Sequence, residues 1–479
     1  MSPTLATFAF AIWILTLFFL NRDREAQTSK ALWLPVVWIS IAGSRMVSEW
    51  MAPATLSQSS AGERYLDGSP FDRNLLTGLL VIGVVVLLFR GTRVSAVLRA
   101  NGAVLMFFFY CLVSIAWSDF PDVAFKRWVK ALGDVVMVLV VLTDANQSAA
   151  IKRFLARAGF LLLPVSILFI KYYPDLGRAY DPGFGFWTVM YTGVTTNKNL
   201  LGMITLVMGL GAIWRFLNMR RAEDGTRKNG QLVAEGALLA MVFWLLWLSN
   251  SATSLSCFLM AGTLILVTSW AWVRRMPALV HALVFAMVAV SSFALFSGSG
   301  GGLLGTLGRN STLTGRTDIW NQVLSMAESP FLGTGFESFW LGPRLQKIWN
   351  IWWWHPNEAH NGYIETYLNL GWVGLTLLGV VLVAGYRSIF ATFRTKPDLA
   401  EIRLAYFFVA IIYNFTESAI RTMNPVWIVF LLSVMAVPDA PAPEEPPPLL
   451  IQRAIKPVER EPQLEPVARA GLRPQRESN

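Results

Sequence analysis

The chain has 479 residues, of which 54% are hydrophobic and 15% are charged, and its mean hydropathy is +0.48. A soluble domain carries about 25% charged residues, so this composition argues against a water-soluble enzyme. The formal net charge of +10 says little about fold, but in a membrane protein the placement of Lys and Arg sets orientation. Cys111 and Cys257 both lie within apolar runs, which excludes a disulfide framework and a cysteine-rich metal site.

Apolar segments that approach the length of a spanning helix, about 20 residues, recur along most of the chain. They predict thirteen spans, at residues 5–20, 31–49, 74–89, 102–117, 129–143, 155–172, 199–217, 231–249, 254–273, 277–296, 363–385, 402–415 and 424–437. No basic residues precede the first run and no small-residue cleavage site follows it, so we expect a retained span, not a signal peptide. The pattern predicts an all-α polytopic membrane protein with about 12–13 transmembrane helices.

Basic residues in the short connections predict the orientation. Six connections are rich in Lys and Arg, at residues 22–30, 90–99, 152–153, 220–228, 274–275 and 387–396, and all fall on one side of a thirteen-span arrangement. The positive-inside rule makes that side cytoplasmic. The N-terminus is then external and the C-terminus cytoplasmic.

A multi-span domain is predicted over residues 1–437, and two segments break the pattern of spans joined by short loops. Residues 297–362 form the longest loop between spans, are placed outside, and are rich in Trp and Phe. Because tryptophan favours the membrane interface, we expect a folded cap that contains short helices. Residues 438–479 are rich in Pro, Glu and Arg, cannot bury a core, and are expected to form a disordered cytoplasmic tail without a catalytic role.

Several cations lie on the side opposite to the one that the topology rule favours. They are Lys126, Arg127, Arg178, Lys198, Arg309, Arg316 and Arg421. Each alone could be a solvated loop charge. Together they line the outer membrane surface, where an anionic lipid-linked substrate would be held, and arginine suits phosphate because its planar donors bind in a bidentate way.

Two short patterns place individual cations at helix starts. The run Thr195–Asn199 precedes the seventh span, so Thr or Asn can cap that helix beside Lys198 and favour an anion there, although an ordinary capped helix fits equally. The run Thr314–Trp320 opens an amphipathic helix in which Arg316 could point into a site while the apolar face lies on the membrane. That face consists of Ile319, Trp320, Val323 and Leu324. A surface pair between Arg316 and Asp318 is the alternative.

Histidine is scarce, and two of the three histidines lie in the run from His355 to Gly362. His360 directly precedes a helix N-terminus, whose partial positive charge disfavours imidazolium. A neutral histidine at the membrane surface is a suitable proton acceptor, although it could simply cap or pack the loop. Zinc binding by His355, Glu358 and His360 is a further alternative that no ligand spacing supports.

Three motifs resemble the O-antigen ligase and polymerase family, which includes exopolysaccharide polymerases. They are Asn197-Lys198-Asn199-Leu200-Leu201-Gly202, then Gly315-Arg316-Thr317-Asp318-Ile319-Trp320, and last His360-Asn361, nine residues, and Gly371-Trp372-Val373-Gly374. The third is fairly specific to the family's large periplasmic loop. A weaker similarity covers Trp117-Ser118 through Arg127, and the whole resemblance covers roughly residues 75 to 435.

The resemblance implies a membrane glycosyltransferase of the GT-C type in the bacterial inner membrane, with its active site facing the periplasm. Its donor would be a glycan on undecaprenyl pyrophosphate. The acceptor would be another lipid-linked repeat unit, for a polymerase, or lipid A–core, for a ligase. Span number and the aromatic cap favour the polymerase. The family also implies a pathway in which a chain-length regulator and a flippase can take part, and no nucleic acid is expected.

The resemblance and the residue chemistry together suggest roles at the site. A sugar pyrophosphate already has a good leaving group, so cations can neutralise it without a metal or cofactor, and an inverting, metal-independent transfer is expected. His360 would be the general base or would orient the acceptor, while Arg316 and Lys198 would hold the pyrophosphate. The supporting residues would be Arg127, Arg178 and Arg421 for the pyrophosphate, with Glu365 or Glu417 as a second acid–base group.

Two readings from other classes compete with a transferase. A transporter or flippase for a lipid-linked glycan would carry charged residues near the centres of its spans. A non-catalytic assembly subunit would tolerate substitution of His360 and Arg316 without consequence.

Overall fold

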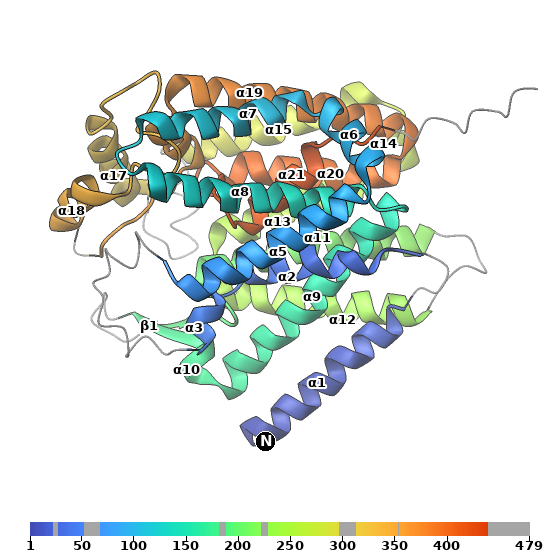
Figure 1. Ribbon diagram of the computed structural model, residues 1–479. Coiled ribbons are helices and arrows are strands. Elements are labelled where there is room, and N and C mark those ends of the chain that lie inside the picture. The colour runs from blue at the N-terminus through green and yellow to red at the C-terminus, as the bar shows by residue number, and fades with distance from the viewer. Residues whose placement is uncertain are drawn as a thin grey trace, which may run out of the picture. The chain divides into compact units, whose positions relative to one another are not determined.

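A computed structural model describes residues 1–22, 27–51, 68–181, 188–221, 229–296, 313–352 and 354–438, all within one compact unit that runs from Met1 to Pro438. Nearly all regular structure in these residues is helical (Figure 1), which confirms the all-α class. The predictions for Arg309, for the start of the long loop and for a disordered tail concern residues 297–312 and 439–479, which lie outside the described residues.

The helices follow the order of the predicted spans. The first half contains α1 (Pro3–Leu20), η1 (Lys30–Leu32), α2 (Trp33–Ala42), α3 (Val47–Met51), α5 (Pro70–Leu88), α6 (Gly91–Ala100), α7 (Gly102–Val113), η3 (Ser114–Trp117), α8 (Pro121–Leu142), α9 (Gln147–Tyr172) and α10 (Pro174–Gly177). The second half contains α11 (Lys198–Arg221), α12 (Asn229–Ser249), α13 (Ala252–Thr268), α14 (Ala271–Arg274), α15 (Pro277–Phe296), α17 (Leu313–Ser325), α18 (Gly342–Ile351), α19 (Gly362–Thr395), α20 (Pro397–Tyr413) and α21 (Pro425–Val434). Each predicted span therefore contains a helix.

Six of these helices are long and apolar enough to cross a membrane: α1, α5, α9, α11, α12 and α19. A seventh span results if α6 and α7, which meet at an angle of 86°, count as one broken span. Four further apolar helices are shorter, at Lys30–Ala42, Ala252–Thr268, Pro277–Phe293 and Pro425–Val434. The chain is thus a multi-pass membrane protein, while the number of twelve to thirteen spans stays a prediction.

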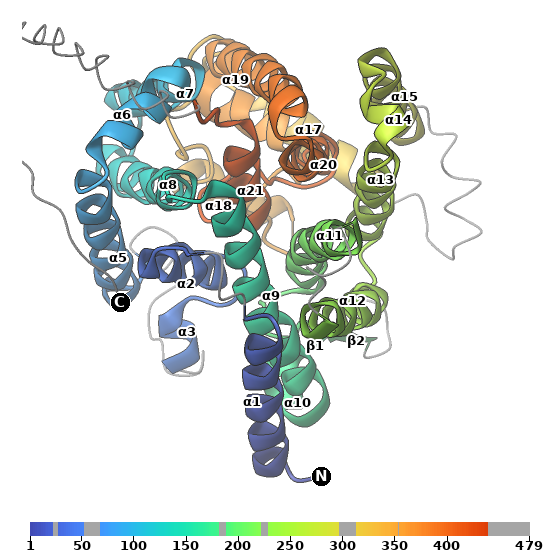
Figure 2. The same ribbon diagram turned by 90° about the vertical axis from the view of Figure 1, so that its right-hand side faces the viewer.

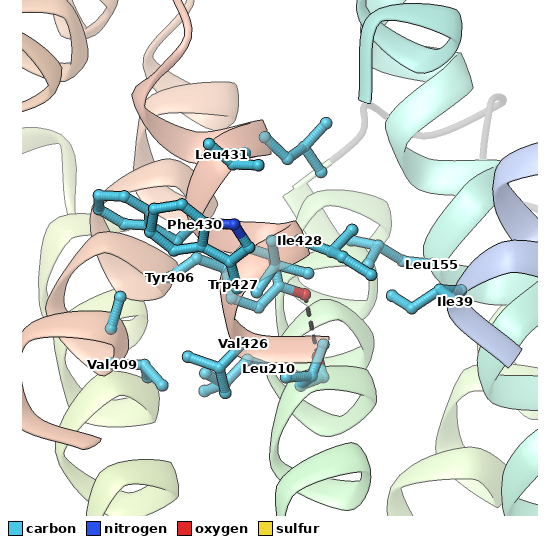
Figure 3. Close-up of a cluster of buried hydrophobic side chains, with 14 of the residues drawn as sticks. Ile39, Leu155, Leu210, Tyr406, Val409, Val426, Trp427, Ile428, Phe430 and Leu431 are labelled. Atoms are coloured by element: carbon cyan, nitrogen blue, oxygen red, sulfur yellow. Dashed lines mark hydrogen bonds between the residues drawn. The ribbon is translucent and has the colours of Figure 1, made fainter. Parts of the chain in front are cut away.

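The short helix α21 lies at the centre of the packing. It contacts α20, α19, α8 and α11, and all ten of its residues are buried. Figure 3 shows Trp427, Phe430 and Leu431 of α21 beside Tyr406 of α20, with Leu155 of α9 and Leu210 of α11 close by. In both views α1 lies at the margin of the bundle (Figures 1 and 2), where it contacts α9 and α12.

A small hairpin interrupts the helical pattern. Strands β1 (Arg178–Asp181) and β2 (Thr188–Tyr191) pair antiparallel, with Arg178 opposite Tyr191. The sequence analysis did not predict these strands. Four residues of mixed polarity give too short an alternation to be recognised in a loop.

Ion pairs join the connections that the topology rule makes cytoplasmic. Arg90 lies 3.6 Å from Asp144, and Arg274 lies 3.1 Å from Asp398 and 3.5 Å from Glu401. These connections lie at the end of the bundle opposite to α17 and α18, as the position of α14 in Figure 1 shows. These described connections thus lie at one end of the bundle, and the side of the membrane that this end faces stays a prediction.

The long loop has a small hydrophobic core of its own. Ile319 and Val323 of α17 pack with Phe339, with Ile348 of α18 and with Leu368 of α19. The suggestion that the apolar face of α17 rests on the membrane is therefore wrong for these two residues, because the loop itself covers them. Leu324 alone of the predicted face is clearly exposed, at 42%.

Candidate functional site

The start of α19 docks onto the segment Asn414–Asn424 between α20 and α21. Asn361 caps α19, since its Oδ1 accepts hydrogen bonds from the amides of Tyr363 and Ile364 at 3.0 Å. The Gly362 amide donates to the carbonyl of Asn414, and a Cβ on Gly362 would lie 1.9 Å from Asn414 Oδ1. Only glycine allows this close approach, which places His360 against the segment.

A cavity of about 1640 Å³ lies between this segment and the N-terminal helices. Its walls come from α2, α3, α5, α8, α10 and α11 and from the loops before α11, α19 and α21. Five of the predicted site residues line it: Arg127, Lys198, His360, Glu417 and Arg421. The structure therefore brings together residues that lie up to 294 positions apart in the sequence.

His360 lies between two carboxylates. Its Nδ1 is 3.0 Å from Glu358 Oε1 and 3.3 Å from Glu417 Oε2. Each carboxylate also binds an arginine: Arg421 contacts Glu358 at 3.0 Å, and Arg316 contacts Glu417 at 3.0 Å. Arg316 also donates to the carbonyl of Thr416, so it binds the 414–424 segment and not Asp318, the alternative partner.

These contacts reverse the protonation expected for His360. Burial by itself would lower the pKa of the imidazole, but the hydrogen bonds and charges of Glu358 and Glu417 outweigh it and raise the pKa to about 9. The prediction of a neutral imidazole is therefore wrong, because a nearby carboxylate outweighs the partial charge of a helix end. Burial raises the pKa of Glu358, but its hydrogen bond to His360 and the nearby cations lower it overall.

The cluster carries more positive than negative charge. With His360 protonated, three cations (His360, Arg316 and Arg421) face two carboxylates. The ligand atoms of Glu358, His360 and Glu417 lie within 4.8 Å of one another, a spacing that a metal ion could use. His355, which the zinc alternative requires, instead stacks on Trp349. Because each carboxylate already binds an arginine, the local charge favours an anion over a cation.

Lys198 reaches the cavity beside this cluster. Asn197 caps α11 by accepting the Leu200 amide at 2.9 Å, so Asn supplies the predicted cap. The next residue, Asn199, donates to Glu417 Oε1 at 3.4 Å and so joins α11 to the cluster. The Lys198 ammonium group makes no hydrogen bond or ion pair with any residue that the structure describes.

Arg127 lies at another part of the cavity wall. It donates to the carbonyl of Glu337 and lies 3.9 Å from its carboxylate, which in turn accepts from Thr422 at 3.4 Å. Arg127 thus supports the 414–424 segment and lines the cavity at the same time. Asp134, on the same helix as Arg127, also holds this segment in place, because its Oδ2 accepts a hydrogen bond from the Met423 amide at 3.0 Å.

Two predicted site residues lie elsewhere among the described residues. Arg178 donates to the carbonyl of Ile170 at 2.9 Å and lies over the Tyr191 ring, and it does not line the cavity. Glu365 accepts hydrogen bonds from Trp340 Nε1 at 2.9 Å and from the amide of Ala359, the neighbour of His360. It lines a smaller cavity of about 70 Å³ that adjoins the large one and shares Glu358 and Arg421 with it, and its contacts are those of a positioning residue.

Strained backbone concentrates around the site. Glu337, His355, His360 and Met423 have φ between 49° and 58°, a left-handed conformation that residues other than glycine rarely adopt. Three of them line the large cavity. Such strain persists only where the surroundings hold it, and it clusters at functional sites.

The sequence analysis missed three cations in the cavity wall: Arg45, Arg73 and Lys130. Lys130 was counted within the fifth span, although its spacing of three residues from Arg127 places both on one helical face. That spacing was the available signal. Arg45 and Arg73 carried no comparable signal, because each lies close to a span end, where basic residues are common.

The Gly371-x-x-Gly374 part of the third motif joins the loop to α19. Gly371 interrupts α19 with φ 64° and ψ −164°. At this break the amides of Trp372 and Val373 donate to the carbonyls of Pro330 and Phe331. Gly371, near the C-terminal end of the motif, therefore has a structural role, while the N-terminal end of the motif contributes His360 to the site.

Fold and site together define a class: a multi-pass membrane protein with a cation-lined cavity beneath a folded loop. Residues 236–379 match the family model described as O-antigen ligase. The chain is also similar to the exopolysaccharide production protein ExoQ of Rhizobium meliloti, at 28% identity over 290 residues, which cover 58% of this chain and 63% of the relative. Both similarities support the resemblance to the O-antigen ligase and polymerase family that the three sequence motifs indicate. The aligned part spans less than two thirds of the relative's length.

Proposed function

We propose that this protein transfers a glycan from undecaprenyl pyrophosphate to a sugar acceptor at the periplasmic face of the bacterial inner membrane. The observation that carries the proposal is the single cavity in which His360 lies beside Lys198 and Arg421. A lipid pyrophosphate is a good leaving group and needs cations to stabilise its charge, and these side chains supply them. The transfer is then metal-independent and inverts the anomeric carbon.

The acceptor in this proposal is another lipid-linked repeat unit, so the protein polymerises O-antigen or exopolysaccharide. The similarity to an exopolysaccharide production protein supports this choice over a ligase that uses lipid A–core. The test is the length of the glycan on undecaprenyl pyrophosphate in a deletion strain. Accumulation of single repeat units supports a polymerase, accumulation of long lipid-linked chains indicates a ligase, and loss of all periplasmic lipid-linked glycan indicates a flippase.

In this mechanism His360 accepts the proton of the acceptor hydroxyl as its oxygen attacks the anomeric carbon and the bond to the pyrophosphate breaks. Arg316 and Lys198 stabilise the departing pyrophosphate, with Arg421 and Arg127 as supports. Glu358 and Glu417 hold the imidazole in place. Their charge makes neutral His360 a stronger base, but at pH 7 a pKa of about 9 leaves only about one molecule in a hundred neutral.

A rate that depends on neutral His360 is expected to rise about tenfold per pH unit up to about pH 9 and then to level off. The sign follows from the raised pKa, because the active neutral form gains population as pH increases. The measurement is kcat against pH from 6 to 10 for the purified protein in vesicles. A rate that falls between pH 8 and 10 would instead assign catalysis to the imidazolium and proton acceptance to a carboxylate.

The variant Glu417→Gln tests whether the midpoint of this pH profile reports the pKa of His360. Loss of one carboxylate beside His360 removes a cause of its raised pKa, so the midpoint of the profile should move to lower pH. A purely structural role for Glu417 would lower the rate without moving the midpoint.

A further inference from the structure

An arginine without a partner lies in the first half of α9, outside the lining of the large cavity. Arg157 forms no hydrogen bond or ion pair with any residue that the structure describes. Its Nη1 is buried and has no acceptor in that part of the chain. The guanidinium lies over the ring of Trp33, 4.6 Å from the ring centroid. Because a buried donor without an acceptor is costly, this position favours a ligand that brings an acceptor.

The ends of three helices that contact α9 indicate how deep Arg157 lies in the membrane. Trp33 is the first residue of α2, and it stacks on Phe18, close to the end of α1. Leu20, the last residue of α1, lies beside Gly230 at the start of α12. Apolar spans end where the headgroup region begins, and tryptophan favours that depth. Arg157, which contacts Trp33, is therefore expected at the level of the phospholipid headgroups.

The position can be reached from the lipid side of the bundle. Helix α1 lies at the margin in both views (Figures 1 and 2) and contacts α9 and α12. Trp33 remains 42% exposed, although its ring contacts Phe18 and Arg157. A lipid whose acyl chains lie beside α1 and α2 could therefore bring its headgroup to the guanidinium.

Two described acids at this end of the bundle already bind other arginines. Asp144, in the loop before α9, lies 3.6 Å from Arg90. Glu235 on α12 pairs with Arg215 of α11 at 2.8 Å. Neither carboxylate contacts Arg157, so its charge is not balanced by these acids and attracts an anion from outside the chain.

We propose that Arg157 binds the phosphate of an anionic phospholipid headgroup, with the acyl chains beside α1 and α2. The planar donors of a guanidinium match phosphate oxygens in a bidentate way, and phosphate is the anion that a membrane presents at this depth. Basic pockets between membrane helices bind anionic headgroups in this manner. The site is separate from the one that serves glycan transfer, so its test does not depend on that activity.

The first test measures the binding of phosphatidylglycerol to the full-length protein in neutral detergent micelles by native mass spectrometry. Arg157→Gln is expected to weaken this binding by about tenfold or more, because it removes a charge-assisted hydrogen bond. Arg99→Gln on α6 is the matched control, since Arg99 already donates to Ser95 of its own helix, and it should bind within about twofold of wild type. Equal binding by wild type and Arg157→Gln overturns the inference.

Thermal unfolding in two lipids separates headgroup binding from a structural role of Arg157. In phosphatidylcholine, loss of an unpaired buried charge should leave the Tm unchanged or raise it, which also shows that the variant folds. In phosphatidylglycerol, wild type binds a ligand that the variant binds weakly, so the Tm of wild type should rise more than that of Arg157→Gln. An equal fall in Tm of the variant in both lipids would assign Arg157 a packing role against Trp33 and overturn the inference.

A soluble phosphate ion is the other source of the same acceptor chemistry. Inorganic phosphate, added to protein in phosphatidylcholine at the concentration used for phosphatidylglycerol, distinguishes the two sources. We expect no change in the Tm of wild type, because the site faces the lipid. A rise equal to that in phosphatidylglycerol would show that Arg157 binds a soluble anion, which overturns the assignment of a lipid ligand.

Discussion

Replacing His360 by alanine is expected to lower the rate of glycan transfer by about 10²–10⁴, the usual contribution of a general base. The physical reason is that His360 alone, among the side chains of the Glu358–His360–Glu417 cluster, exchanges a proton near the pH at which enzymes work. The measurement is single-turnover transfer by the purified protein in vesicles, so that binding and chemistry are separated.

Backbone strain at His360 calls for a second variant. Alanine tolerates φ of 51° poorly, whereas asparagine adopts left-handed conformations more readily. His360→Asn therefore preserves the fold at that position but cannot act as a base, and it should lose as much activity as His360→Ala. If the His360→Asn variant kept activity within a few fold of wild type, His360 would not be the general base. His281→Ala is the control, since His281 lies on α15 and bonds Tyr386 at 2.6 Å, away from the cavity.

The helical framework was predictable because each apolar run satisfies its own backbone hydrogen bonds. A membrane-spanning segment must do so, and its composition alone then indicates a helix. The same local logic predicted a Thr or Asn cap before α11, which Asn197 supplies by binding the amide three residues ahead. These features depend on neighbours in the sequence.

The chemical state of the site was not predictable in the same way. His360 meets Glu417 across 57 residues, and that carboxylate helps to reverse its expected protonation. Arg178 was grouped with the external cations, but the short hairpin directs it to a carbonyl of α9. Glu365 stays a candidate acid–base group, and its carboxylate accepts a hydrogen bond from Trp340 of the cap. Each outcome depends on contacts between distant segments.

The substitution Gly371→Ala is expected to destabilise the fold by about 3 kcal/mol or more. With φ 64° and ψ −164°, Gly371 occupies a region that is essentially restricted to glycine, and a side chain there costs about 1–3 kcal/mol in strain. An added Cβ would also lie 2.2 Å from the carbonyl oxygen of Phe331, so backbone must move as well. Steric exclusion at a special φ/ψ is among the few causes of such large effects.

Gly379→Ala is the matched control on the same helix, because a Cβ there meets no atom within 4 Å. It should change stability by less than about 1 kcal/mol, in the stabilising direction if at all. Thermal unfolding of both variants, followed by tryptophan fluorescence in detergent, measures the difference. Movement at Gly371 would displace residues 330–335 and, with them, Glu337, which pairs with Arg127 in the cavity wall. We therefore expect the Gly371→Ala variant to lose activity at temperatures where the protein is still folded. Equal melting temperatures and equal activities of the two variants would show that the break in α19 does not hold the cap in place.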